Sequence, residues 1–162
     1  MSALFYGGGA VALLATALAI SRAHPVHALL YFITSLLAVA VVLFSLGAPF
    51  AAALEVLVYA GAIMVLFVFV VMLLNLGPTV ESERAYLQLR YWLGPGLLAG
   101  VLATQFLLAV ADQAGAVGGA EVSAKQVGIA MFGPYLLAVE LASMLLLAGL
   151  VAAFHIGKGR EP

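Results

Sequence analysis

The sequence predicts an all-α integral membrane protein with five transmembrane helices, and three observations lead to this fold class. Hydrophobic residues make up 66% of the 162 positions, charged residues only 8%, and the mean hydropathy is +1.23. A soluble domain has about a quarter of its residues charged, so the composition excludes that class. Five apolar runs each reach the roughly 20 residues that a helix needs to cross a hydrocarbon core. We expect residues 1–162 to form a single membrane domain.

Short breaks divide the chain into these spans. Pro25 separates the first two, because proline disfavours helix in the residue before it. Residues 47–49 leave so little chain between the second and third spans that these helices must be antiparallel neighbours, and Gly77 with Pro78 ends the third. The expected spans are residues 2–21, 26–46, 50–76, 92–111 and 135–154.

Two loops and two groups of glycines complete the expected organisation. Residues 77–91 read as a short polar helix near the cytoplasmic surface. The loop at 112–134 holds a short helix that begins at Ser123, with Gln126 at the capping-box spacing, which we expect to form a lid on the outer surface. Small residues let membrane helices approach, so the glycines at 7–9 and the pair Gly96 and Gly100 indicate helix contacts.

The distribution of basic residues predicts the orientation. Five spans place the first loop, the third loop and the C-terminus on one side, with five basic residues against Lys125 alone on the other. Basic residues favour the cytoplasmic side. The first 21 residues contain no Lys or Arg, so we expect an uncleaved first span rather than a signal peptide. The N-terminus is then outside and the C-terminus cytoplasmic.

The composition also limits the chemistry. Seven acidic and six basic residues give no nucleic-acid footprint, and the absence of cysteine excludes thiolate metal sites and iron–sulfur clusters from this chain. His24 and His27 lie three residues apart with no third ligand nearby. No base is placed beside a nucleophile, and no glycine-rich loop could hold a phosphate. We expect no catalytic, cofactor-binding or metal-binding residue.

Two carboxyl groups are placed inside expected spans. Glu55 and Glu140 each lie about five residues, or roughly 8 Å of helical rise, from the outer ends of the third and fifth spans. Each is costly to insert in a bilayer, at about 2.5–3.5 kcal/mol. Either they pair with polar neighbours near the outer interface, or they are proton-accessible groups of functional use.

Tyr59 and Gly61 follow Glu55 in the same span. Tyr59 lies one turn deeper on the same face, and its hydroxyl could relay a proton or simply bond a backbone carbonyl. Gly61 has two interpretations: close helix contact, or a point where the winding changes, since π-bulges tend to mark functional sites. Met64, Val65 and Phe67 follow and would supply packing.

Two stretches resemble the J chain of bacterial NADH:quinone oxidoreductase, respiratory complex I. They are residues 24–75, which include VYAGAIMVLF at 58–67, and residues 123–155, which include FGPYLLAVELASMLLLAGLVAAFH. The resemblance implies a membrane chain without a redox centre, which couples quinone reduction to proton translocation through a third transmembrane helix whose π-bulge can convert to regular helix. It implies no activity for this chain alone.

The resemblance also assigns residues and partners. Glu55, Tyr59 and Glu140 become proton-path candidates, and Gly61, Met64, Val65 and Phe67 become helix-switch candidates. NADH, FMN, iron–sulfur clusters and quinone would be bound by partner chains. Those partners would be the quinone-site chain, the A and K chains and the antiporter-like chains, in a bacterial inner (plasma) membrane.

Two other functions stay open at this point. The chain could be a small membrane subunit of a cation/proton antiporter or of a membrane-bound hydrogenase complex. It could also be an assembly scaffold whose polar residues are inert.

Overall fold

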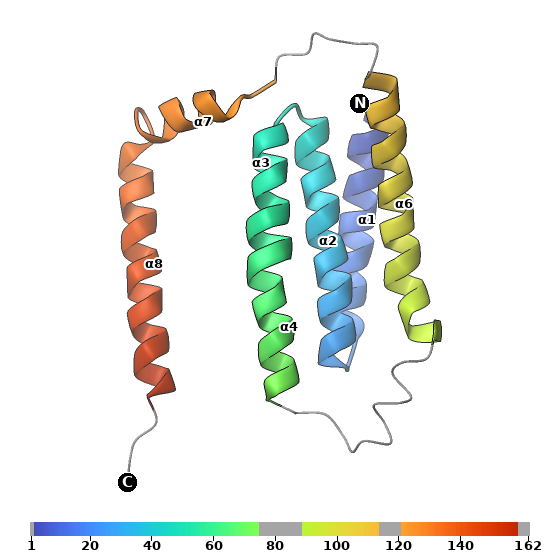
Figure 1. Cartoon of the computed structure of the whole chain (residues 1–162), viewed down its shortest axis with the longest axis horizontal. Coiled ribbons are helices and arrows are strands. Elements are labelled where there is room, and N and C mark those ends of the chain that lie inside the picture. The colour runs from blue at the N-terminus through green and yellow to red at the C-terminus, as the bar shows by residue number, and fades with distance from the viewer. Residues whose placement is uncertain (1, 75–88, 114–120, 159–162) are drawn as a thin grey trace. The chain divides into compact units, whose positions relative to one another are not determined.

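The computed structural model describes residues 2–74, 89–113 and 121–158, which are almost entirely helical (Figure 1). The third span is one continuous rod that contains a π-helix, η1, between two α-helical pieces. The elements are α1 (Ser2–Ser21), α2 (Pro25–Ser45), α3 (Pro49–Leu54), η1 (Glu55–Ile63), α4 (Met64–Leu73), α6 (Leu89–Gln113), α7 (Ala124–Met131) and α8 (Leu136–Gly157).

Five helical stretches in these residues are long and apolar enough to cross a membrane, which confirms the predicted fold class at that level. Their bounds differ from the expected ones by three residues or fewer. Most of the predicted polar helix at residues 77–91 lies outside the described residues. The five stretches are Ala3–Ser21, Pro25–Ser45, Pro49–Leu73, Trp92–Ala111 and Leu136–Gly157.

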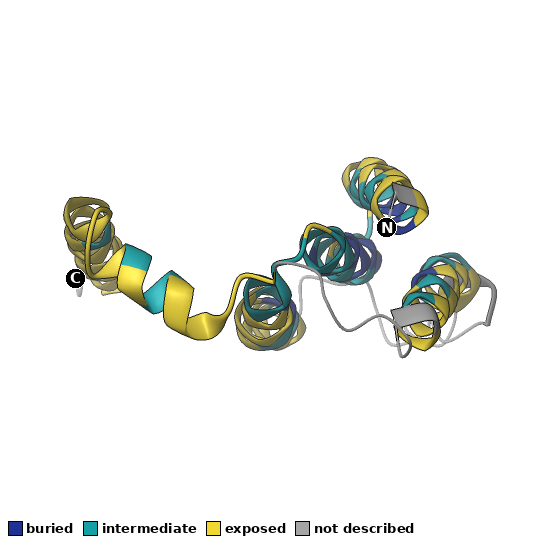
Figure 2. Ribbon diagram, turned by 90° about the horizontal axis from the view of Figure 1, so that it is seen from above, coloured by how far each residue is buried: buried dark blue, intermediate teal, exposed yellow. Residues whose placement is uncertain are grey.

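The chain divides into two compact units, of which the first is Met1–Glu121. Within it α2 is central and packs against α1, the third span and α6, and α1 also packs against α6 (Figure 2). Val11 of α1, Ala38 of α2 and Leu102 of α6 form the buried core where these three helices meet. The side chains at this contact are mostly small or aliphatic, as expected where membrane helices pack closely.

The turn between α2 and the third span forms for identifiable local reasons. Gly47 has φ of 78°, a left-handed conformation that glycine adopts without steric cost. The N–H of Gly47 bonds the carbonyl of Phe44, and the N–H of Ala48 bonds that of Leu43, which is the Schellman pattern of helix termination. Pro49 then begins α3 at a position where its missing N–H costs nothing.

The second unit, Val122–Pro162, contains α7 and α8. The predicted capping box is confirmed: the Ser123 N–H donates to Oε1 of Gln126 over 2.9 Å, and the Gln126 N–H donates to Oγ of Ser123 over 3.3 Å. No residue of α8 is buried within this unit, as Figure 2 shows by its colour. A spanning helix that leaves all its sides uncovered requires lipid or another chain around it.

The glycines that make close contacts are only partly those expected. A Cβ at Gly7 would lie 2.7 Å from the Gln105 amide, and a Cβ at Gly94 would overlap the Tyr31 hydroxyl. At Gly96 and Gly100 a Cβ would meet nothing within 4 Å among the described residues. The predicted helix contact at this pair is therefore absent from the described part of the chain.

Candidate helix-switch and proton-path region

The π-helix at Glu55–Ile63 is the most unusual backbone feature of the described chain. At its end the Met64 N–H bonds the carbonyl of Tyr59, five residues earlier, instead of the four-residue spacing of an α-helix. π-Helical segments are rare, and they occur frequently at functional sites. This segment places Glu55, Tyr59 and Gly61 in a single stretch of altered winding.

Gly61 is half-buried, and its lack of a side chain matters to this winding. A Cβ at this position would lie 3.1 Å from the carbonyl oxygen of Val56, five residues earlier along the same π-helix. That distance is shorter than an ordinary van der Waals contact, so the backbone would have to shift by a few tenths of an ångström. Glycine therefore suits the π-helical form at this position.

The other three helix-switch candidates lie in α4, directly after the π-helix. Met64 is 2% exposed and is the buried residue of α4, whereas Val65 and Phe67 are 61% and 53% exposed. Met64 is therefore packed within the first unit, whereas the side chains of Val65 and Phe67 are mostly uncovered.

Glu55 and Tyr59 face the margin of the first unit. Glu55 is half-buried at the first position of the π-helix, and Tyr59 is 52% exposed. Neither side chain has a hydrogen-bond partner in the part of the chain that the structure describes. Glu140 is exposed on α8 and belongs to the second unit, so its predicted match in depth with Glu55 remains a prediction.

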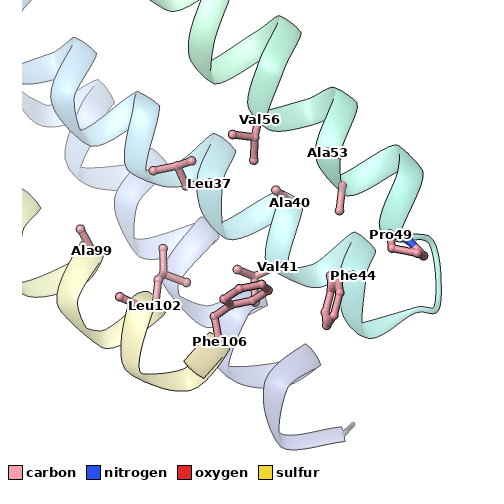
Figure 3. A pocket seen from close by; sticks show the side chains of 12 residues that line it. Leu37, Ala40, Val41, Phe44, Pro49, Ala53, Val56, Ala99, Leu102 and Phe106 are labelled. Atoms are coloured by element: carbon pink, nitrogen blue, oxygen red, sulfur yellow. The ribbon is translucent and has the colours of Figure 1, made fainter. Parts of the chain in front are cut away.

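A cavity of about 420 Å³ adjoins the π-helix between α2, the third span and α6 (Figure 3). Val56 of the π-helix and Ala53 of α3 border one side, and Leu102 and Phe106 of α6 border the other. The third span packs on α2, and the cavity lies between this span and α6. The lining of the cavity is apolar and consists of Leu37, Ala40, Val41, Phe44, Pro49, Ala52, Ala53, Val56, Ala99, Leu102, Ala103 and Phe106.

Comparison with known proteins shows which family the chain belongs to. The family of NADH-ubiquinone/plastoquinone oxidoreductase chain 6 matches residues 15–156. The chain belongs to this family. Its described helices therefore form a multi-pass membrane subunit of an NADH–quinone oxidoreductase, an enzyme complex.

Curated relatives match over nearly the whole chain, and each is called NADH-quinone oxidoreductase subunit J. The relative from Pseudomonas aeruginosa is 58% identical, over 98% of this chain and 97% of its own length. That from Escherichia coli K12 is 57% identical, over 98% and 87%. That from Buchnera aphidicola of Schizaphis graminum is 46% identical, over 99% and 100%. The family resemblance in the sequence is thereby confirmed.

A row of polar side chains on α2 was missed in the sequence. His27, Tyr31, Thr34 and Ser35 are all buried, and they recur at the three- and four-residue spacing of one helix face. Thr16 of α1 meets the end of this row, with its Oγ1 atom 2.7 Å from Oγ of Ser35. Reading the polar positions of α2 by helical period would have found this face, because all four positions are visible in the sequence.

The described residues hold no group of three or more His, Asp or Glu side chains that could bind a metal ion, and the sequence contains no cysteine. The rings of His24 and His27 lie 5.4 Å apart, without a third ligand among the described residues. The described part of the third span thus contains a carboxyl group, a tyrosine and a glycine in a π-helical winding.

Proposed function

We propose that this chain couples quinone reduction on partner chains to proton translocation, through a change of winding in its third transmembrane helix. The observation that carries the proposal is the π-helix at Glu55–Ile63, within a family of NADH–quinone oxidoreductase chains. The subunit itself contributes no redox centre, and flavin, iron–sulfur clusters and quinone are bound elsewhere in the complex.

The geometry of the change follows from helix dimensions. An α-helix turns by about 100° and rises about 1.5 Å per residue, so loss of one surplus residue from the π-helix rotates everything beyond it by roughly that amount. Met64 then leaves its buried position on the first unit, and Val65 or Ile63 takes its place. Aliphatic side chains are thereby moved into or out of a path that waters could occupy.

The cavity beside Val56 would give the first turn of the π-helix room to change its winding. Closely packed interfaces resist changes of even one methylene group, whereas an unfilled apolar space lets neighbouring side chains move. On the opposite side, the Schellman turn and Pro49 fix the start of the third span to α2. Rotation is therefore confined to the part of the span that follows the π-helix.

Glu55 and Tyr59 are the polar groups that this motion would connect to a proton path, with Glu140 as a third candidate. Ionisable residues within membrane spans commonly mark proton relays. The quinone-site chain, the A and K chains and the antiporter-like chains would surround the chain in a bacterial inner membrane. The N-terminus is outside and the C-terminus cytoplasmic in this arrangement.

The test is a graded substitution of Gly61 in the assembled complex. Gly61→Ala adds the Cβ that approaches the Val56 carbonyl, and Gly61→Val adds a branched side chain at the same place. Both should disfavour the π-helical form. We expect protons translocated per electron in proteoliposomes to fall from wild type to Gly61→Ala to Gly61→Val, while electron transfer to artificial acceptors is retained.

Ala62→Val is the matched control, because Ala62 is exposed in the same π-helix. This variant should retain the wild-type proton-to-electron ratio. A Gly61→Val complex that pumps as wild type would contradict the proposal. So would structures of the complex at rest and under turnover that contain the same winding throughout residues 55–63.

A further inference from the structure

A second apolar cavity lies in a different part of the first unit, between α1 and α6. Its volume is about 370 Å³, and several of its side chains are largely exposed, with Leu14 at 57% and Leu97 at 66%. It is thus a groove open to the surroundings of the unit. Its lining consists of Leu14, Leu18, Leu93, Gly94, Leu97 and Leu98.

A cation is held at one end of this groove. Arg22 follows Leu18 by four residues, just past the end of α1, so it continues the line of Leu14 and Leu18 on that helix. Its guanidinium carbon lies 5.2 Å from the centre of the Tyr31 ring. The Tyr31 hydroxyl in turn abuts Gly94, which lines the groove. The cation–π contact therefore keeps Arg22 near the groove.

The described helices of this unit offer Arg22 no carboxylate at that end. Glu55 is the single acidic residue in the first 80 positions of the sequence. It lies near the start of the third span, which adjoins the C-terminal end of α2, whereas Arg22 lies near the N-terminal end of α2. Glu81 and Glu83 lie outside the described residues. An arginine that has no carboxylate on the described helices around it is suited to bind phosphate oxygens in bidentate fashion.

We propose that this groove and Arg22 bind one anionic phospholipid, with an acyl chain along the leucines and the headgroup phosphate on the guanidinium. The chemistry of the groove favours this occupant, because a lining of five leucines and one glycine ends near a guanidinium group that can bind a phosphate. Basic pockets between transmembrane helices are known to bind anionic headgroups.

The experiment uses the complex purified from its membrane and placed in nanodiscs that contain phosphatidylglycerol with a photoreactive acyl chain. After irradiation, labelled peptides are identified by mass spectrometry. We expect labels on residues 14–18 of α1 and 93–98 of α6, and about ten-fold or greater loss of label in Arg22→Gln, because charge-assisted bonds to phosphate are lost. The same probe with a phosphatidylcholine headgroup should label these peptides weakly.

Two pairs of variants separate the site from general effects. Lys158→Gln removes a charge from the end of α8 and should leave the label unchanged. Leu97→Trp fills the groove and should abolish the label, whereas Leu107→Trp, at an equally exposed position of α6 outside the lining, should not. Equal labelling by both headgroups, full labelling of Arg22→Gln, or no labelling of the wild type because a partner chain covers the groove would each overturn the proposal.

Discussion

The side-chain oxygens of Thr16 and Ser35 lie 2.7 Å apart and join α1 to α2 in a partly buried contact. The carbonyl oxygen of Ala12 is 2.8 Å from Oγ1 of Thr16 and 3.2 Å from Oγ of Ser35, so these three oxygens share the two hydroxyl hydrogens. Polar contacts of this kind hold membrane helices together where lipid provides no hydrophobic driving force. The pair therefore fixes the register between α1 and α2.

Removal of either hydroxyl should weaken this contact. We expect Thr16→Val and Ser35→Ala each to lower the free energy of unfolding by about 0.6–1.7 kcal/mol, and the double variant to lose less than the sum. Unfolding in mixed micelles measures both. Thr104→Val is the control, because Thr104 is exposed and bonds the Gly100 carbonyl of its own helix. Additive effects would show that the two hydroxyls act separately.

Gly94 should not tolerate a side chain. Gly94→Ala places a methyl group on the buried Tyr31 hydroxyl, and overpacking of this kind costs about 1–3 kcal/mol. Tyr31→Phe removes the hydroxyl and should restore part of the loss in the double variant. Gly96→Ala, where nothing lies within 4 Å, should be close to neutral. Yield and thermal stability of the complex measure each; an unaffected Gly94→Ala complex would contradict this packing.

Loss of the capping box should loosen α7 without affecting α8. Ser123→Ala removes the acceptor of the Gln126 N–H, and such a loss typically costs about 1 kcal/mol. Amide hydrogen exchange should rise roughly five-fold or more over residues 124–131. Ser143→Ala is the comparison, since Ser143 bonds the Glu140 carbonyl within α8. Unchanged exchange in α7 would mean that the box adds nothing to its stability.

Substitution of the proton-path candidates in the third span should reduce proton pumping. Glu55→Gln removes the ionisable group and Tyr59→Phe removes the hydroxyl, with little change of shape in either case. If these groups carry protons, translocation in proteoliposomes should fall several-fold while electron transfer to artificial acceptors persists. Tyr6→Phe, on the largely exposed Tyr6 of α1, serves as the control. Normal pumping by both variants would leave these side chains with packing roles alone.

The spans and one helix start could be predicted because they depend on local rules. Bilayer thickness sets the length of an apolar helix, so the span at residues 92–111 was predicted with the same bounds as the structure has. The Ser123 cap needs only the residue three positions later. The turn at residues 47–49 is equally local, since Gly47 adopts the positive φ and Pro49 begins a helix.

The contacts between helices were harder to predict, because they depend on which faces meet. Gly7 and Gly8 lie against other helices, as expected, and so does Gly94, which was not expected to. Gly96 and Gly100 have the spacing of a contact pair, yet a Cβ there would meet nothing within 4 Å among the described residues. Sequence spacing does not show which way a helix is rotated. The π-helix was expected from the family resemblance rather than from the residues, since Gly61 alone is compatible with either winding.

The turn at Gly47 determines which end of the third span could rotate. If the winding changes at Gly61 as proposed, the start of the span at Pro49 stays in place against α2, and the residues that follow Gly61 turn. The half of the span that begins at Pro49 would stay still while the half that ends at Leu73 rotates. A partner chain in contact with the Leu73 end of the span would then be moved by this rotation when quinone is reduced.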